Sequence, residues 1–233
     1  MKYLLLGAGL QGTAIAFDLL RNAPGTEKLV VVDEVQTRLW DLAERLQDGR
    51  LETVCADVRD QDTLAPLMAD ADVAVSAVNY WLNAALAGYA VENGTHFLDL
   101  GGNNEIVARE FELNERAVAR GVSIIPDCGL APGLVGILGT WLIDDLARAE
   151  SLRLRVWDLP AEPRPPLNYM TVFSVQGLIN KYVEPAVILR EGRVKTVPAL
   201  SELETVTFPP PYGDLEAFQT SGGTSTLPRT LAG

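Results

Sequence analysis

The feature that most constrains the fold is a glycine-rich turn near the N-terminus. The segment Gly7-Ala8-Gly9-Leu10-Gln11-Gly12 follows the apolar run Tyr3–Leu6 and opens a stretch rich in Ala and Leu. A lone G-x-G-x-x-G is a weak signal, but this strand–turn–helix setting is the one that dinucleotide binding requires. Gly7 permits the tight turn, Gly9 lets the backbone approach a pyrophosphate, and Gly12 lets helix and strand meet closely. The alternative is a purely structural glycine turn.

Two acidic residues after the second apolar run bear on the choice of cofactor. Asp33 lies 21 residues after Gly12, where an acid binds the adenosine ribose 2′-hydroxyl. Glu34 follows it, and two acids repel a 2′-phosphate, so the pattern predicts NAD rather than NADP, although Arg38 is close in sequence.

Three further positions are expected at the same cofactor site. Asp57 follows the third apolar run and either meets the adenine edge or caps the next helix. Ala77 and Val78 end the fourth run, beside the expected position of the nicotinamide ribose.

Six apolar runs of four to six residues alternate with helical patterns over residues 1–150 and have the length of buried parallel strands. The runs are Tyr3–Leu6, Leu29–Val32, Thr53–Ala56, Val73–Val78, Phe97–Leu100 and Val122–Ile125. Gly49 and Gly94 follow two of the helical patterns as expected end signals. This alternation predicts an α/β fold with a Rossmann-type doubly wound parallel sheet, in the strand order 3-2-1-4-5-6.

The pattern changes after residue 150. Ser151–Trp157 alternates between apolar and charged residues, which predicts a half-buried strand. Val187–Leu189 and Val194–Val197 flank Arg190-Glu191-Gly192-Arg193, a hairpin signal. Leu203–Phe208 and Leu215–Phe218 are two more strand candidates. We therefore expect a dinucleotide-binding domain over residues 1–150 and a smaller α+β substrate domain over residues 151–233.

Composition excludes several classes of partner. The 19 Lys and Arg against 31 Asp and Glu give a net charge of −12, which argues against nucleic acid and anionic membranes. Two cysteines indicate a reducing compartment rather than a disulfide framework. A single histidine, His96, rules out a His-rich metal site, so no metal is expected; His96 itself is interpreted as a core residue of the fifth strand.

Polar residues follow three of the predicted strands, and ligands of open α/β sheets bind outside the carboxyl ends of the strands. Tyr80, Asp99 and Cys128 are the candidate acid–base groups among them. Each has a structural alternative: Asp99 as a helix cap, Cys128 as a small buried residue, and Tyr80 as a pocket wall. The other polar or flexible positions at these strand ends are Asn79, Gly102, Asn103 and Asp127.

The motifs together resemble a known family. The Gly7–Gly12 turn, Asn79-Tyr80, Asp99-Leu100-Gly101-Gly102-Asn103 and, above all, Pro126-Asp127-Cys128-Gly129-Leu130-Ala131-Pro132-Gly133 are similar to the saccharopine dehydrogenase-like enzymes, with the lysine 6-dehydrogenase branch nearest. The segments Tyr169–Tyr182 and Glu216–Thr224 resemble the substrate domain of that family.

The resemblance implies an NAD-linked, cytoplasmic homodimer that oxidises the terminal amine of an amino acid, with Tyr80, Asp99 and Cys128 implicated in proton transfer. Substrate contacts are expected at Asn79, Gly102, Asn103, Thr220 and Thr224, with Ser174, Gln176 and Ser221 as weaker candidates. Family members continue past the equivalent of Gly233, so an incomplete substrate domain is expected. Three interpretations stay open: a lysine 6-dehydrogenase, an enzyme acting on the secondary amine of saccharopine or carboxynorspermidine, and an inactive NAD-binding module.

Overall fold

The computed structural model of the chain describes residues 1–157, 159–160, 162–166, 168–170 and 173–232. Its contacts divide the chain into two compact units, Met1–Gly101 with Glu105–Cys128 and Gly102–Asn104 with Gly129–Gly233. No described helix is long and apolar enough to cross a membrane.

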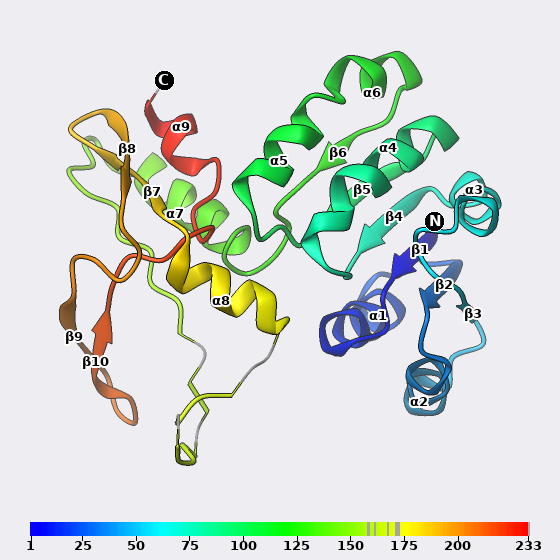
Figure 1. Cartoon of the computed structure of the whole chain (residues 1–233), viewed down its shortest axis with the longest axis horizontal. Helices are drawn as coiled ribbons and strands as arrows, with labels where there is room; N and C mark the ends of the chain where they lie inside the picture. Colours follow the sequence, from blue (N-terminus) through cyan, green and yellow to red (C-terminus); the bar gives the residue numbers. More distant parts are fainter. Residues whose placement is uncertain (158, 161, 167, 171–172, 233) are drawn as a thin grey trace. The chain divides into compact units, whose positions relative to one another are not determined.

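The first unit is a six-stranded parallel sheet in the order β3-β2-β1-β4-β5-β6, which confirms the predicted topology (Figure 1). Its strands are β1 (Lys2–Leu6), β2 (Lys28–Asp33), β3 (Leu51–Cys55), β4 (Val73–Ser76), β5 (His96–Asp99) and β6 (Ile124–Ile125). Its helices are α1 (Leu10–Asn22), α2 (Gln36–Leu46), α3 (Gln61–Ala69), the 3₁₀ turn η1 (Tyr80–Leu82), α4 (Asn83–Asn93), α5 (Asn104–Phe111) and α6 (Asn114–Arg120).

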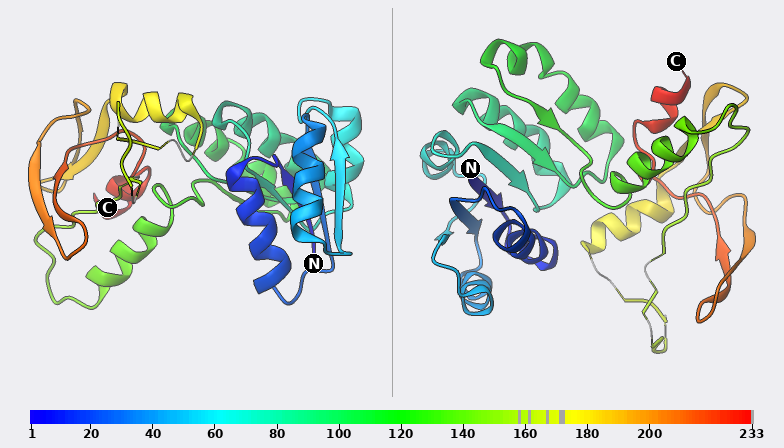
Figure 2. Two further views of the ribbon diagram at one scale, coloured as in Figure 1. Left: turned by 90° about the horizontal axis from the view of Figure 1, so that it is seen from below. Right: turned by 180° about the vertical axis from the view of Figure 1, so that it is seen from behind.

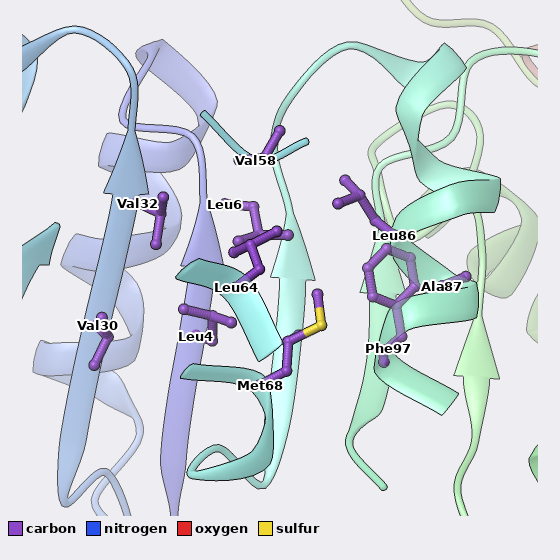
Figure 3. Packing of buried hydrophobic residues seen from close by; sticks show 12 residues of the cluster. Leu4, Leu6, Val30, Val32, Val58, Leu64, Met68, Leu86, Ala87 and Phe97 are labelled. Carbon is purple, nitrogen blue, oxygen red and sulfur yellow. The ribbon is translucent and has the colours of Figure 1, made fainter. Parts of the chain in front are cut away.

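Side-chain alternation along β1 builds a core on both faces of this sheet. Leu4 and Leu6 point toward one face, where Leu64 and Met68 of α3 and Phe97 of β5 are buried beside them (Figure 3). The period of two in a strand turns the residue between them to the other face. There Leu5 lies in a second buried cluster, with side chains of α1 and α2. Because both faces are covered, the strands need no polar alternation.

The second unit contains two helices, two separate hairpins and a terminal helix among its described residues. They are α7 (Leu134–Asp144), α8 (Val175–Val183), β7 (Ala186–Arg190), β8 (Arg193–Val197), β9 (Glu204–Phe208), β10 (Gly213–Ala217) and α9 (Leu227–Ala232). The β7–β8 and β9–β10 pairs are antiparallel (Figure 2). Glu191 and Gly192 both have positive φ, 54° and 69°, so they form the type I′ turn that the predicted hairpin favours.

The division between the units lies earlier than the change near residue 150 that the sequence pattern suggested. Helix α7 belongs to the second unit. A Cβ at Gly139 would lie 2.9 Å and 3.2 Å from methyl groups of Leu154 and Leu152, so the helix packs on the segment that follows it. The sequence pattern of an apolar helix that follows a strand is the same whether the helix packs on the first or the second unit, so the pattern did not locate the boundary.

Three local predictions were wrong. Ser151–Trp157 forms no strand. Helix α2 ends at Leu46, and its C-cap residue is Gln47, which adopts the left-handed conformation at φ 45° and donates its N–H to the Ala43 carbonyl oxygen, so Gly49 is not the end residue. His96 is exposed rather than in the core, with its Nδ1 accepting the Ser123 N–H at 3.0 Å. Of the predicted substrate domain, positions 158, 161, 167, 171, 172 and 233 lie outside the described residues.

Candidate active site

The glycine-rich loop between β1 and α1 has no room for a side chain at two of its glycines. Gly7 has φ +105°, and a Cβ there would lie 2.9 Å from the Ala77 carbonyl oxygen. A Cβ at Gly12 would lie 2.0 Å from the Gly7 carbonyl oxygen. A Cβ at Gly9, in contrast, would meet nothing within 4 Å. The loop is therefore fixed on both sides and open in the middle, as a backbone cradle for a phosphate requires.

Helix α1 begins directly at this opening. Gly9 is its N-cap and has no side chain that could accept the N–H groups of the first turn. The first turn carries no acidic residue, and the exposed Leu10 and Gln11 occupy it. The N–H groups at the start of a helix and the positive end of its dipole favour an anionic ligand such as a pyrophosphate.

Asp33 ties the end of β2 to the glycine-rich loop. Its side chain is only 6% exposed. One carboxylate oxygen accepts the Ala8 N–H at 2.8 Å and the other accepts the Val35 N–H at 2.8 Å, with Arg38 Nη1 at 3.6 Å. A carboxylate has about four lone-pair sites, so these bonds leave acceptor capacity for a ribose hydroxyl.

The remaining predicted cofactor positions are Ala77 and Val78, which lie near the glycine-rich loop, and Asp57, which lies after β3. Ala77 and Val78 follow β4, and Val78 Cγ1 would be 3.1 Å from a Cβ at Gly7. Asp57 follows β3 and holds Arg59 in an ion pair at 2.6 Å, which lowers the pKa of Asp57 to about 2. The helix-cap alternative for Asp57 is wrong, because Asp60 caps α3 by accepting backbone N–H groups.

A second polar cluster lies at the carboxyl ends of β5 and β6. The side chain of Asp99 is fully buried, and its Oδ1 accepts the N–H groups of Gly101 and, at 3.4 Å, of Asp127. The Asp99 carbonyl oxygen accepts the Cys128 N–H at 2.7 Å. Asp127 has φ +63°, so the chain makes a left-handed turn where the two strand ends meet. The backbone thus brings Asp99, Asp127 and Cys128 together, as their positions after neighbouring strands predicted.

Glu110 of α5 completes this cluster and was missed by sequence reasoning. It is 2% exposed, and burial, then the charge of Asp99, raise its pKa to about 9. Burial also raises the pKa of Asp99, against hydrogen bonds that favour its ionised form. A signal existed: Val107 and Glu110 are three residues apart on α5, which places both on its buried face.

The Cys128 thiol is held in its protonated form. Although the residue has exposed surface, shielding of the thiol and then the nearby Asp99 and Asp127 raise its pKa to about 11. The thiol donates to the Ile125 carbonyl oxygen at 3.3 Å. At neutral pH this group is a proton donor and not a thiolate nucleophile.

A buried side-chain contact links the end of β4 to the same cluster. Ser76 donates its hydroxyl to Asn83 Oδ1 at 2.7 Å, and a hydrogen bond from Asn83 favours the ionised form of Asp99. Tyr80 and the exposed Asn79 lie in the turn after β4, where the Tyr80 ring meets Trp81 edge to face at 5.3 Å.

The predicted substrate residues of the second unit take part in internal hydrogen bonds. Asn103 donates to Glu184 at 3.3 Å, and Ser221 donates to the same carboxylate at 3.3 Å. The Thr224 hydroxyl donates to the Val187 carbonyl oxygen at 3.2 Å. Glu184, at the end of α8, was not predicted, and nothing in its sequence context marks it.

Of the other candidates in this unit, two belong to the start of α8 and two lie in loops. Ser174 caps α8 through the Gly177 N–H, and Gln176 donates to Asn180 at 3.2 Å. Gly102 has φ +122°, and Thr220 is half-buried. Among the side chains that the structure describes, no group of three His, Cys, Asp or Glu residues is arranged to hold a metal ion.

Comparison with known proteins matches two family models and several relatives to the chain. The sequence model of the saccharopine dehydrogenase NADP binding domain matches residues 3–125, and that of the saccharopine dehydrogenase C-terminal domain matches residues 129–231. The chain is 26% identical over 152 residues to the saccharopine dehydrogenase [NADP(+), L-glutamate-forming] of Saccharomyces cerevisiae, covering 63% of this chain and 33% of that protein. It is 25% identical over 214 residues to the mitochondrial alpha-aminoadipic semialdehyde synthase of Bos taurus, covering 88% of this chain and 22% of that one.

A solved structure shares the fold of the chain. The apo saccharopine dehydrogenase (L-Glu forming) of Saccharomyces cerevisiae superimposes with a TM-score of 0.72 at 22% identity, over 99% of this chain and 52% of that one. The chain thus spans about half of that structure and a third or less of the curated relatives named above. Because the two sequence models together cover nearly all of its residues, the chain belongs to the saccharopine dehydrogenase family.

Proposed function

We propose that this chain is an NAD-dependent oxidoreductase that removes a hydride from the carbon bearing the terminal amine of a lysine-type substrate. The observation that carries the proposal is the acid–thiol cluster at the carboxyl ends of β5 and β6, in which the buried Asp99 and Glu110 lie beside Asp127 and the Cys128 thiol. In sheets of this kind, ligands bind outside that edge. The glycine-rich loop at the end of β1 lies on the same edge.

The residues of the cluster suit the proton steps of such a reaction. A nicotinamide, when bound, supplies the hydride acceptor. An amine with a pKa of ~10.4 is protonated at neutral pH and has no lone pair to assist hydride loss, so a base must take a proton first. Asp99 is the candidate acceptor: burial raises its pKa, and hydrogen bonds from Asn83, Gly101 and Asp127 act in the opposite direction by favouring its ionised form. The protonated Cys128 thiol is suited to return a proton, and Tyr80 is the third candidate.

NAD is the cofactor that the residues after β2 favour. Asp33 keeps acceptor capacity for a ribose hydroxyl, and the exposed Glu34 adds negative charge where a 2′-phosphate would lie. Arg38 is near, but its guanidinium lies 3.6 Å from the Asp33 carboxylate and is partly neutralised by it. The open space at Gly9 suits the pyrophosphate.

Two substrates fit the proposal. The first is free L-lysine: loss of the hydride leaves an imine at the ε-carbon, and hydrolysis of its C=N bond by water would yield the 6-semialdehyde and ammonia, as the motif resemblance implies. The second is saccharopine, whose secondary amine needs the same proton steps; the yeast relative, named for that substrate, favours it.

The test is NADH formation from a panel of lysine, ornithine, saccharopine and polyamine adducts. We expect turnover with lysine or saccharopine. NAD binding without turnover on any of them would instead support an inactive NAD-binding module.

We also propose that the chain is a homodimer. Helix α7 carries several exposed apolar side chains, among them Ile137, Trp141 and Leu142. Large exposed apolar patches are unfavourable in a monomer. Sedimentation equilibrium should show a dimer; a monomer at all concentrations would contradict it.

A further inference from the structure

Asp99 and Glu110 form a pair of buried carboxyl groups that would repel each other if both were ionised. Both side chains are almost fully buried, at 0% and 2% exposure. Asp99 Oδ2 and both carboxyl oxygens of Glu110 have no hydrogen-bond partner. The two carboxyl groups are nevertheless near enough for a hydrogen bond to influence the pKa of each. Two buried carboxyl groups within hydrogen-bonding reach of each other cannot both stay ionised.

The groups around the pair add negative charge rather than cancel it. Asp127 and Cys128 face it from the segment after β6, and Asn83 faces it from α4. Among the described side chains, no ion pair joins a Lys, Arg or His to Asp99 or Glu110. A proton is therefore the available means of neutralising the charge.

We propose that Glu110 is a positioning residue that keeps its proton in the folded protein and donates it in a hydrogen bond to Asp99 Oδ2. This assignment needs no ligand. Its consequence for turnover rests on the proposed function, in which Asp99 is the base.

The distribution of donors decides which partner keeps the proton. Asp99 Oδ1 accepts the N–H groups of Gly101 and Asp127, and Asn83 further favours the ionised form. Glu110 has no donor of this kind, and burial followed by the charge of Asp99 raise its pKa to about 9. One proton on Glu110 then satisfies two of the three unpartnered oxygens and fixes the orientation of the Asp99 carboxylate.

The direct test is infrared spectroscopy of the wild-type protein at pH 7. The proposal expects the carbonyl stretch of a buried protonated carboxylic acid, shifted in D₂O and absent from the Glu110→Gln variant. Glu112→Gln is the matched control, because Glu112 is exposed just after α5. No such band at pH 7, or a band that survives in Glu110→Gln, would overturn the proposal. If Glu110→Gln does not fold, loss of the wild-type band as the pH rises through about 9 gives the same answer.

Stability against pH is a second measurement that needs no activity. The folded-state pKa of Glu110 is raised, so its contribution is fully present below the unfolded value near 4.5 and is lost as the pH rises through about 9. Relative to Glu110→Gln, the unfolding equilibrium constant of the wild type should increase by up to about tenfold per pH unit in that window. Parallel curves for the wild type and Glu110→Gln would contradict a retained proton.

Turnover then separates positioning from mere packing. Glu110→Gln can still donate a hydrogen bond to Asp99, so we expect rescue of most of the turnover, with NAD affinity unchanged. Glu110→Leu cannot donate, and we expect kcat to fall by about tenfold and the acidic limb of its pH profile to move. Equal turnover in both variants would refute the positioning role. A wild type without any turnover would sink the proposed function, while the infrared and stability results would still decide the proton assignment.

Discussion

Asp33 and Asp99 each end a strand of the same sheet and each is buried, but their surroundings differ. Asp33 receives two backbone N–H groups at 2.8 Å and has Arg38 beside it. Asp99 receives N–H groups on one oxygen only and faces another carboxyl group with the other. The Asp33 carboxylate has a backbone N–H donor on each oxygen and holds a loop in place. The Asp99 carboxylate has N–H donors on one oxygen only, and the neighbouring Glu110 and Cys128 side chains have raised pKa values, so protons are retained at this strand end.

The largest effect that sharpens this contrast is expected at the Cys128 thiol. Its pKa near 11 means that alkylation, which needs the thiolate, should accelerate by about tenfold per pH unit from pH 8 to pH 10 and reach roughly five-hundredfold at pH 11. The measurement is the iodoacetamide rate in a Cys55→Ser background. Replacing Asp99 by Asn should raise the rate at pH 8, since it removes a negative charge. A rate that levels off below pH 9 would show that the carboxyl groups do not act on the thiol.

The next largest effect is expected from a substitution in the glycine-rich loop, where Gly12 has no room for a side chain. Gly12→Ala places a Cβ 2.0 Å from the Gly7 carbonyl oxygen, so we expect a loss of about 3 kcal/mol in the free energy of unfolding, together with loss of NAD binding. Urea denaturation measures the first and fluorescence titration the second. Gly25→Ala is the control, because a Cβ there meets nothing within 4 Å. Similar stability of both variants would mean that the loop yields more easily than its geometry indicates.

Turnover measurements distinguish the acid–thiol cluster from the glycine-rich loop. Cys128→Ala and Tyr80→Phe should each lower kcat on the order of 10²-fold while NAD affinity stays nearly constant, because they remove proton-transfer groups and leave the glycine-rich loop intact. Steady-state kinetics with a parallel NAD titration checks this. Wild-type turnover in both variants would make these residues pocket walls.

The smallest expected effect concerns cofactor choice. Asp33→Ser should weaken NAD binding by about tenfold and narrow the difference between NAD and NADP, since it removes a charge-assisted acceptor that also holds the Ala8 N–H. Titration of the wild type and the variant with both cofactors measures this. Equal affinity of the wild type for NAD and NADP would refute the NAD assignment.

The sheet could be predicted from sequence because its signals are local and repeated. Buried strands such as Leu29–Val32 are continuous apolar runs, and the right-handed crossover rule then leaves few strand orders. The β7–β8 turn was equally readable, because Glu191-Gly192 fits a type I′ turn. Likewise, the proximity of Asp99 and Cys128 could be predicted, because the carboxyl ends of neighbouring parallel strands meet at one edge of the sheet.

The remainder depends on tertiary contacts that local patterns indicate weakly or not at all. Ser151–Trp157 alternates like a strand, yet a strand forms only where a neighbour offers backbone partners. Gln47 ends α2 where Gly49 had the better intrinsic conformation. Glu110 was passed over because a glutamate on a short helix is usually solvated; its role depends on the burial of Asp99 opposite it.

The close fit between Gly12 and Gly7 also bears on the thermodynamics of cofactor association. A loop that is already fixed before the dinucleotide arrives has little backbone entropy left to lose. Affinity at this end of the molecule then reflects the interactions made with the dinucleotide rather than order imposed on the loop, which is the advantage of a preorganised receptor.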